Sequence, residues 1–202
     1  MFAVALAMMT ASGVRTAFGV YVKPMEVEFG WSRAVLSEVA ALSLLLLGVV
    51  SPLAGRLADR WGGRRVMTFS IVLLGVGAIS SAFVSRLWHV YVTAGILMAL
   101  GSGGAGLATG SAVIARWFEA RRGVAFGLAS SAISLGQLGI IPLAAAITLT
   151  YGWRTSYFVL GLGLLTLVFP VAAGLIRNDP EERKIFTSSA RSLADASGAS
   201  GT

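Results

Sequence analysis

Six long apolar stretches alternate with short charged turns along the 202-residue chain. Each stretch is long enough to cross a bilayer as a helix, which takes about 20 residues. Helices are favoured because every backbone polar group inside lipid needs a partner in its own segment, and the alternation that is typical of membrane β-barrels is missing. The pattern predicts an all-α, polytopic membrane protein with six transmembrane helices, at residues 2–22, 34–58, 66–84, 89–115, 124–149 and 156–176.

The composition agrees with a membrane protein and excludes several kinds of site. Hydrophobic residues make up 56% of the chain and charged residues only 12%, whereas a soluble domain carries about 25% charged residues. The net charge of +7 does not indicate nucleic-acid binding, because the positive residues lie in short turns between apolar stretches. With no cysteine and a single histidine, His89, the chain lacks the residues for disulfides, thiol catalysis or a multi-histidine metal site. No metal or cofactor is predicted.

Lysine and arginine are divided unevenly between the two sides of the predicted bundle. One set of turns, together with the C-terminal tail, carries eleven of these residues, and the opposite set carries four. The positive-inside rule places the richer side in the cytoplasm. We therefore expect an integral protein of a bacterial-type inner or plasma membrane, with both termini cytoplasmic.

The predicted transmembrane domain covers residues 1–176, and a tail follows it. Residues 177–202 start with charged residues and become rich in Ser, Ala and Gly, a composition typical of a flexible cytoplasmic linker. The first apolar stretch has an alternative interpretation as a cleaved signal peptide. A transmembrane helix is favoured, because no basic region precedes the stretch and its apolar pattern continues past residue 20.

A charged turn between the second and third predicted helices has a recognisable pattern. It consists of Gly55-Arg-Leu-Ala-Asp59-Arg-Trp-Gly62-Gly-Arg64-Arg65. This turn resembles the signature loop of major facilitator superfamily transporters, whose pattern is roughly Gly-x-Leu-Ala-Asp-Arg-x-Gly-Arg-Arg. It departs from that pattern at Gly63, where the family usually has a basic residue.

The resemblance implies a mechanical role for this turn. In the family, the loop helps to hold the outward-open state, and its acid interacts with the other half of the transporter. The alternative is a topological role, in which positive residues anchor the loops inside and only the arginines matter. The mechanical interpretation predicts a conformational gate of Gly55, Asp59, Arg60, Gly62, Arg64 and Arg65, joined by Arg121 and Arg122 of the next inner turn.

Three further motifs narrow the resemblance. They lie at residues 28–33 (Glu-Phe-Gly-Trp-Ser-Arg), 117–129 and 151–154 (Tyr-Gly-Trp-Arg), and together they are similar to the monocarboxylate-porter and oxalate/formate-antiporter branch. Ala120 and Val124 depart from the branch pattern, which has lysine and leucine there. The resemblance implies the N-terminal six-helix half of a two-half transporter, with the tail in place of the linker between halves. A natural half, a truncated reading frame and an incomplete one remain alternatives.

Arg15 is the sharpest functional candidate, because it lies inside the first predicted helix. An arginine within a membrane span costs about 2.5–3.5 kcal/mol on insertion scales, and such residues usually face a cavity or a partner. Met8, Ser12 and Gly19 share its helical face. A guanidinium that faces a central cavity suits a carboxylate, which it can bind in a bidentate manner. The alternative is an arginine that extends to the outer interface or binds a helix carbonyl.

Three other polar residues are weaker candidates for substrate binding. Glu38 lies about one turn inside the second helix, where it could pair with Arg15, relay a proton or face the lipid headgroups. Gln137 is on a polar stripe of the fifth helix, where lining the cavity and hydrogen bonding between helices are equally favoured. Tyr21 lies near the outer interface, where tyrosine is common.

Residues 101–106 formally fit the dinucleotide-binding pattern Gly-x-Gly-x-x-Gly. The pattern has no predicted strand before it, so it does not indicate a phosphate site. Close helix packing is the favoured role of these small residues.

The sequence as a whole predicts transport of a small organic anion, such as a monocarboxylate or dicarboxylate, by alternating access in a secondary transporter. Proton coupling or exchange is compatible with it. The expected partners are the lipid bilayer, the solute and either a C-terminal six-helix half or a second copy. The alternative is a membrane scaffold or sensor, or an inactive fragment, that keeps the fold. An enzyme is not predicted, because no catalytic motif such as His-Glu-x-x-His or Gly-x-Ser-x-Gly is present.

Overall fold

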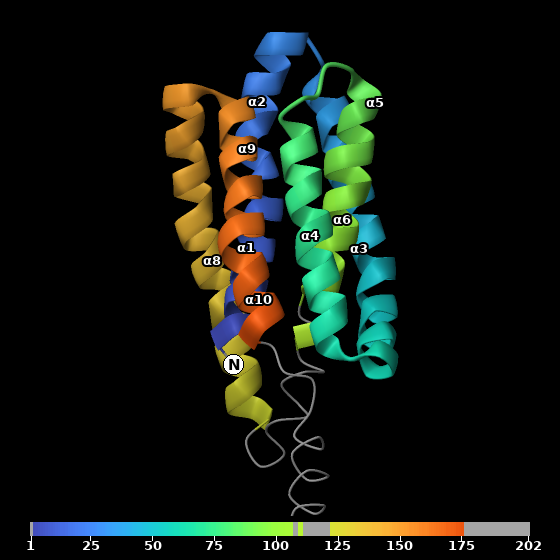
Figure 1. Ribbon diagram of the computed structural model, residues 1–202. Coiled ribbons are helices and arrows are strands. Elements are labelled where there is room, and N and C mark those ends of the chain that lie inside the picture. Colours follow the sequence, from blue (N-terminus) through green and yellow to red (C-terminus); the bar gives the residue numbers. More distant parts are fainter. Residues whose placement is uncertain (1, 107–108, 111–121, 176–202) are drawn as a thin grey trace, which may run out of the picture.

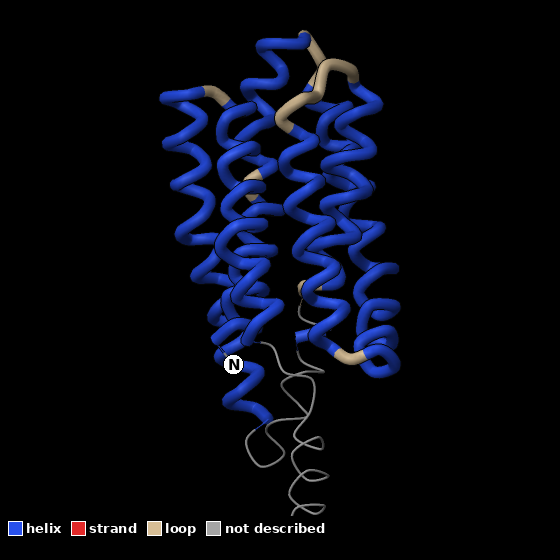
Figure 2. The backbone as a smooth tube through the Cα atoms, in the orientation of Figure 1, coloured by secondary structure: helices blue, strands red, loops and turns tan. Residues whose placement is uncertain are grey.

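The computed structural model describes residues 2–106, 109–110 and 122–175. Within these ranges every regular element is a helix, as Figure 2 shows. The elements, joined end to end, form six rods that run alternately up and down (Figure 1). In chain order the rods are α1 (Phe2–Thr16) with α2 (Phe18–Phe29); α3 (Arg33–Trp61); α4 (Gly63–Ser81); α5 (Leu87–Val90) with the π-helical η1 (Tyr91–Leu97) and α6 (Met98–Gly104); α8 (Arg122–Tyr151); and α9 (Trp153–Gly163) with the π-helical η2 (Leu164–Val168) and α10 (Phe169–Leu175).

The predicted all-α, polytopic fold is confirmed. Four of the described helices are long and apolar enough to cross a membrane, namely Arg33–Trp61, Gly63–Ser81, Ser130–Tyr151 and Trp153–Ala172. The first rod runs seven residues further than the predicted 2–22 and is interrupted at Ala17. The fourth predicted span, 89–115, is only partly described, and the tail at 177–202 lies outside the described residues.

Glycine makes the two tightest turns between rods possible. Gly62 alone separates α3 from α4, with φ 88°, and Gly152 alone separates α8 from α9, with φ 86°. Side chains rarely adopt this left-handed region, and glycine enters it without steric cost. One residue is therefore enough to reverse the chain between antiparallel rods.

Small residues bring several helices close together. A Cβ on Gly13 would lie 2.6 Å from Ile140 of α8, and one on Gly101 would lie 2.6 Å from the backbone nitrogen of Leu74 in α4. The same applies to Gly103, where a Cβ would lie 2.8 Å from Val50 of α3. Backbones approach closely where no side chain intervenes. Gly101 and Gly103 thus occupy the helix contacts that sequence analysis favoured over a nucleotide loop.

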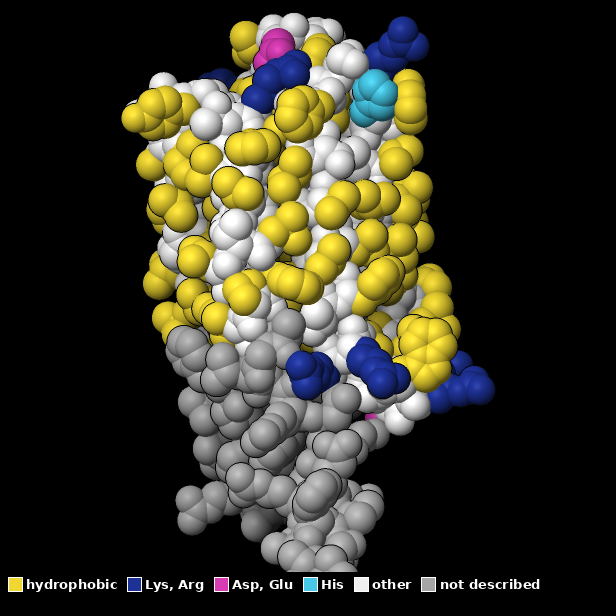
Figure 3. Space-filling view, in the orientation of Figure 1, with side chains coloured by type: hydrophobic (Ala, Val, Ile, Leu, Met, Phe, Trp, Pro, Cys, Tyr) yellow, Lys and Arg dark blue, Asp and Glu magenta, His cyan; other side chains and the backbone are white. Residues whose placement is uncertain are grey.

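The outside of the bundle is apolar in its middle and charged at its ends (Figure 3). Leu45, Phe69, Leu138 and Leu167 each expose more than half of their surface. Soluble proteins rarely expose so large an apolar area. A bilayer around the middle of the rods accounts for it.

Candidate functional site

Arg15 lies in the last turn of α1, two residues before the interruption at Ala17. Its side chain is half-buried. It forms no hydrogen bond or ion pair with any residue in the described part of the chain. Arg15 instead lines two pockets. The one nearer the turn at residues 55–65 is called the inner pocket, and the one nearer the start of α3 is called the outer pocket.

The inner pocket has a volume of about 290 Å³ and is lined by both polar and apolar side chains. Gln137 of α8 reaches across to α1, where its Nε2 donates a hydrogen bond to the Ser12 hydroxyl at 2.9 Å. An amide nitrogen carries two protons, and this bond uses one of them. The pocket is lined by Met8, Ser12, Arg15, Leu47, Ser51, Ser102, Gly106, Ile133 and Gln137.

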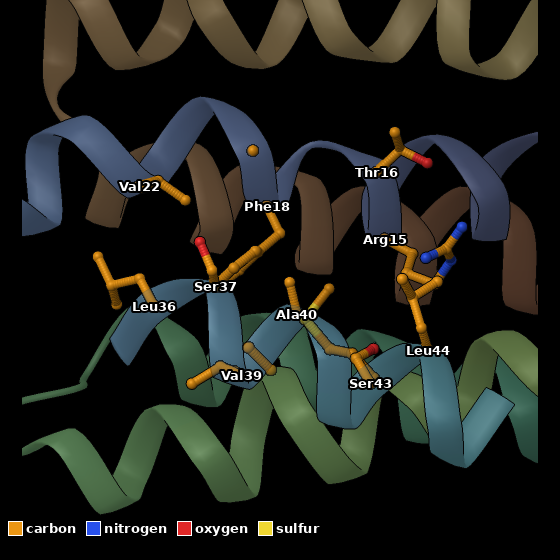
Figure 4. Close-up of a pocket in the computed structure, with 13 residues that line it drawn as sticks. Arg15, Thr16, Phe18, Val22, Leu36, Ser37, Val39, Ala40, Ser43 and Leu44 are labelled. Atoms are coloured by element: carbon orange, nitrogen blue, oxygen red, sulfur yellow. The ribbon is translucent and has the colours of Figure 1, made fainter. Parts of the chain in front are cut away.

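The outer pocket is largely apolar and has a volume of about 230 Å³. It lies between the first rod and α3, with a contribution from the fourth rod (Figure 4). Figure 4 shows the guanidinium of Arg15 at the end near Leu44, directed away from Phe18. The lining consists of Arg15, Thr16, Phe18, Gly19, Val22, Leu36, Ser37, Val39, Ala40, Ser43, Leu44, Ala94 and Met98.

The four predicted substrate-binding residues do not gather at one place. Arg15 and Gln137 share the inner pocket. Glu38 is exposed on α3 and accepts a hydrogen bond from the Tyr91 hydroxyl at 3.0 Å. Tyr21 is fully buried, with its hydroxyl 2.9 Å from that of Ser156. Neither Glu38 nor Tyr21 lines either pocket.

The predicted gate residues that the structure describes lie at the end of the bundle where α3 turns into α4. Gly55, Asp59 and Arg60 are in the last two turns of α3, and Gly62 forms the turn. Arg64 and Arg65 lie in the first turn of α4, which begins at Gly63. Asp59 and Arg64 each have an interaction partner. Arg122 begins α8, whereas Arg121 lies outside the described residues.

Sequence reasoning missed the residues of α3 that line the pockets. Leu36, Ala40, Ser43, Leu47 and Ser51 recur at spacings of three and four residues, so they share one face of the helix. Ser43 and Ser51 interrupt the otherwise apolar stretch at residues 39–55 and mark that face. The helical spacing of these residues could have identified the pocket-lining face of α3 from the sequence.

Two of the motifs that carried the family resemblance meet at the outer end. Glu28 of α2 accepts a hydrogen bond from Trp153 Nε1 at 2.6 Å and pairs with Arg154 Nη2 at 2.8 Å. Arg154 also lies over the Trp153 ring, 4.8 Å from its centroid. Burial disfavours the charged carboxylate, but the hydrogen bonds and the positive charge outweigh it and lower the pKa of Glu28. The cluster fastens α2 to α9.

Comparison with known proteins agrees with this architecture. The chain matches the family model of the Major Facilitator Superfamily over residues 4–199. It is 32% identical to mouse (Mus musculus) monocarboxylate transporter 11 over 166 residues, which is 82% of this chain and 36% of that protein. It is 34% identical to bovine (Bos taurus) monocarboxylate transporter 1 over 155 residues, 73% of this chain and 30% of that protein.

A bacterial relative gives a similar result. The uncharacterized MFS-type transporter YhjX of Escherichia coli (strain K12) is 33% identical over 153 residues, which is 74% of this chain and 37% of that protein. The chain therefore spans about a third of the length of these curated relatives. The helical membrane fold, the match over nearly the whole chain and these relatives together confirm that the chain belongs to the Major Facilitator Superfamily.

Proposed function

We propose that the chain supplies one wall of a transport pathway for a small organic anion, and that Arg15 binds the anion's carboxylate. The observation that carries this proposal is a half-buried guanidinium with no partner in the described part of the protein, which opens onto two pockets. A desolvated cation without a counter-ion is costly. An anionic solute relieves that cost while it is bound.

The inner pocket provides the remaining contacts for a carboxylate. Guanidinium N–H groups form a planar fork that matches two carboxylate oxygens. Gln137 and Ser12, which are already joined to each other, add neutral donors beside that fork. We leave Glu38 and Tyr21 out of this site, because each has its own hydrogen-bond partner away from the pockets.

Transport by alternating access needs a second wall. Transporters of this kind rock one half against the other around a site near the midplane. A C-terminal six-helix half, or a second copy of this chain, would close the pockets from the side opposite α1 and α3. With both termini in the cytoplasm, the charged turn at residues 55–65 faces inward. There Asp59 and the neighbouring arginines act as a gate between the halves. Transport of the solute together with protons is one mode of operation.

The gate has its own test. Replacing Asp59 by Asn removes the acid and keeps the arginines that fix topology. Reduced transport together with a shifted ratio of inward-open to outward-open states supports the gate. If both quantities stay at their original values, the loop has only its topological role.

The anion site is tested by uptake of radiolabelled carboxylates into proteoliposomes that contain the full gene product. We expect saturable uptake, and a loss of at least about 100-fold in the Arg15→Ala and Arg15→Lys variants, since neither side chain offers a bidentate fork. Arg33→Ala is the matched control, because Arg33 is exposed at the start of α3 and lines neither pocket. Normal uptake by both Arg15 variants refutes the site. Arginine-dependent binding without uptake would instead favour a sensor.

A further inference from the structure

One exposed strip of α3 changes from apolar to cationic along the helix. Leu45, Val49 and Leu53 expose 49–71% of their surface. Arg56 and Arg60, which are also exposed, follow them toward the end of the helix. Seven residues make nearly two full turns, so Arg56 lies in line with Val49, and Arg60 lies in line with Leu53. These five residues form a single strip, called the α3 strip below.

The two arginines of the α3 strip have no partner within the protein as described. Neither Arg56 nor Arg60 forms a hydrogen bond or ion pair with any residue in the described ranges, whereas Asp59 and Arg64 nearby each have an interaction partner. Residues four apart on a helix are neighbours, with about 5–6 Å between their Cβ atoms. At that spacing, both guanidinium groups can contact one phosphate group.

We propose that the α3 strip binds an anionic phospholipid of the surrounding bilayer, with the lipid phosphate at the two arginines and an acyl chain along the apolar residues. Figure 3 shows basic side chains where the apolar middle of the bundle ends, which is the level of the lipid headgroups. Trp61, at the end of the same helix, is 57% exposed, and tryptophan is enriched at this level of a membrane. Basic residues next to a membrane span attract anionic headgroups.

The apolar part of the α3 strip has the length of an acyl chain. The helix rises about 12 Å from Leu45 to Leu53, and the hydrocarbon of one leaflet is about 15 Å deep, half of the bilayer core. Gly48 is exposed between Leu45 and Val49, and a Cβ added to it would meet no atom within 4 Å. An acyl chain can therefore lie against the helix there.

The opposite end of α3 provides a matched control. Arg33 is exposed there, but Ser37 and Glu38, about one turn further along, are exposed and polar. A phosphate at Arg33 would meet the Glu38 carboxylate instead of an apolar strip. Arg56 lies outside the predicted gate, so its replacement tests lipid binding without changing a gate residue.

The experiment titrates the full gene product in mild detergent with phosphatidylglycerol or phosphatidylcholine of identical acyl chains, and native mass spectrometry counts the bound lipid. Both lipids carry a phosphate, but the choline group cancels its charge. We expect phosphatidylglycerol to bind at least about tenfold more tightly. Arg56→Ala and Arg60→Ala should each weaken it about fivefold. Arg56→Lys should weaken it less than about twofold, since lysine also binds phosphate, and Arg33→Ala should leave it unchanged.

Excess glycerol 3-phosphate distinguishes a lipid from a soluble phosphate. It should leave phosphatidylglycerol bound, because it has no acyl chain. Displacement at a concentration equal to that of the lipid would show a site for a soluble anion and refute the lipid site.

Two further results would overturn the inference. One is equal binding of the two lipids, and the other is phosphatidylglycerol binding that Arg56→Ala and Arg60→Ala leave unchanged while the Tm shows both variants to be folded. Either result would favour another part of the transporter as the cover of the α3 strip. No outcome depends on Arg15, so the lipid site and the proposed function are tested separately.

Discussion

The two sides of the first rod are built in opposite ways. Toward α8 the contact leaves no room for side chains, since a Cβ on Gly13 would lie 2.8 Å from the Gly136 carbonyl oxygen. Toward α3 the same rod borders the outer pocket, and Gly19 faces open space. Arg15 lies at this open side. One tightly packed face fixes the helix in place, and the other face leaves a charged side chain beside open volume.

Two arginines show the same contrast. Arg154 donates to Glu28 and to the Ala82 carbonyl and lies over two aromatic rings. Arg15 has no polar partner in the described residues and lies beside empty volume. A side chain whose donors are all engaged holds a structure together, whereas an unengaged one is available for binding.

The largest effect is expected at the packed side of the first rod. In Gly136→Ala, the new methyl group would collide with the Met9 carbonyl oxygen of α1, and backbone atoms cannot move aside as a flexible side chain can. We expect a loss of about 3 kcal/mol in unfolding free energy, and a Tm lower by about 6–12 °C in detergent solution. Gly139→Ala, one turn further along α8 and with nothing within 4 Å, should keep or raise the Tm. Equal Tm values in the two variants would contradict the close contact.

Arg154→Ala and Arg15→Ala should have opposite effects on the stability of the fold and on carboxylate binding. Arg154→Ala should lower the unfolding free energy by about 1 kcal/mol, because the pair with Glu28 is 41% and 42% exposed and partly screened by solvent. That corresponds to a Tm lower by about 2–4 °C, with carboxylate binding kept. Arg15→Ala should do the reverse and abolish binding while the Tm stays level or rises. If the two variants lose equal stability, Arg15 is a structural residue.

Substitution of Tyr21 tests whether this residue packs the helices together or binds the substrate. The Ser156 hydroxyl donates to the Ala144 carbonyl at 3.1 Å, so the Tyr21 hydroxyl donates to Ser156. Tyr21→Phe removes one hydrogen bond between helices, worth about 0.6 kcal/mol inside a membrane. We expect a Tm lower by about 1–2 °C and unchanged carboxylate affinity. A tenfold loss of affinity would return Tyr21 to the site that the sequence predicted.

The sequence predicted the fold well because its signals are local. About 20 consecutive apolar residues specify a membrane span, and a lone arginine within such a span is conspicuous. Gly62 and Gly152 likewise mark their turns, since each must adopt a backbone conformation that few other residues tolerate. Family membership followed from a charged turn of fixed spacing at residues 55–65.

The site was predictable only in part, because its pairings are not local. Helical periodicity places Glu38 on a face of its helix but does not say which neighbour that face meets. Its partner Tyr91 is 53 residues away, and the partner of Tyr21 is 135 residues away. Arg15 and Gln137 could each be proposed from polarity alone, whereas the pocket between the first rod and α3 exists only once the helices are packed.

The smallest effect concerns acid stability at the outer end of the bundle. The pKa of Glu28 is lowered in the folded protein, so its charge stabilises the fold above the pKa of an unfolded glutamate, about 4.3. That stabilisation is lost as the pH falls below about 4 and through the lowered folded value. The Tm of the wild type should therefore decline more steeply in this range than that of Glu28→Gln, which cannot titrate but can still accept a hydrogen bond from Trp153. Parallel profiles would show that the charge pair contributes little, and that the aromatic contacts of Phe29 with Trp153 hold α2 against α9.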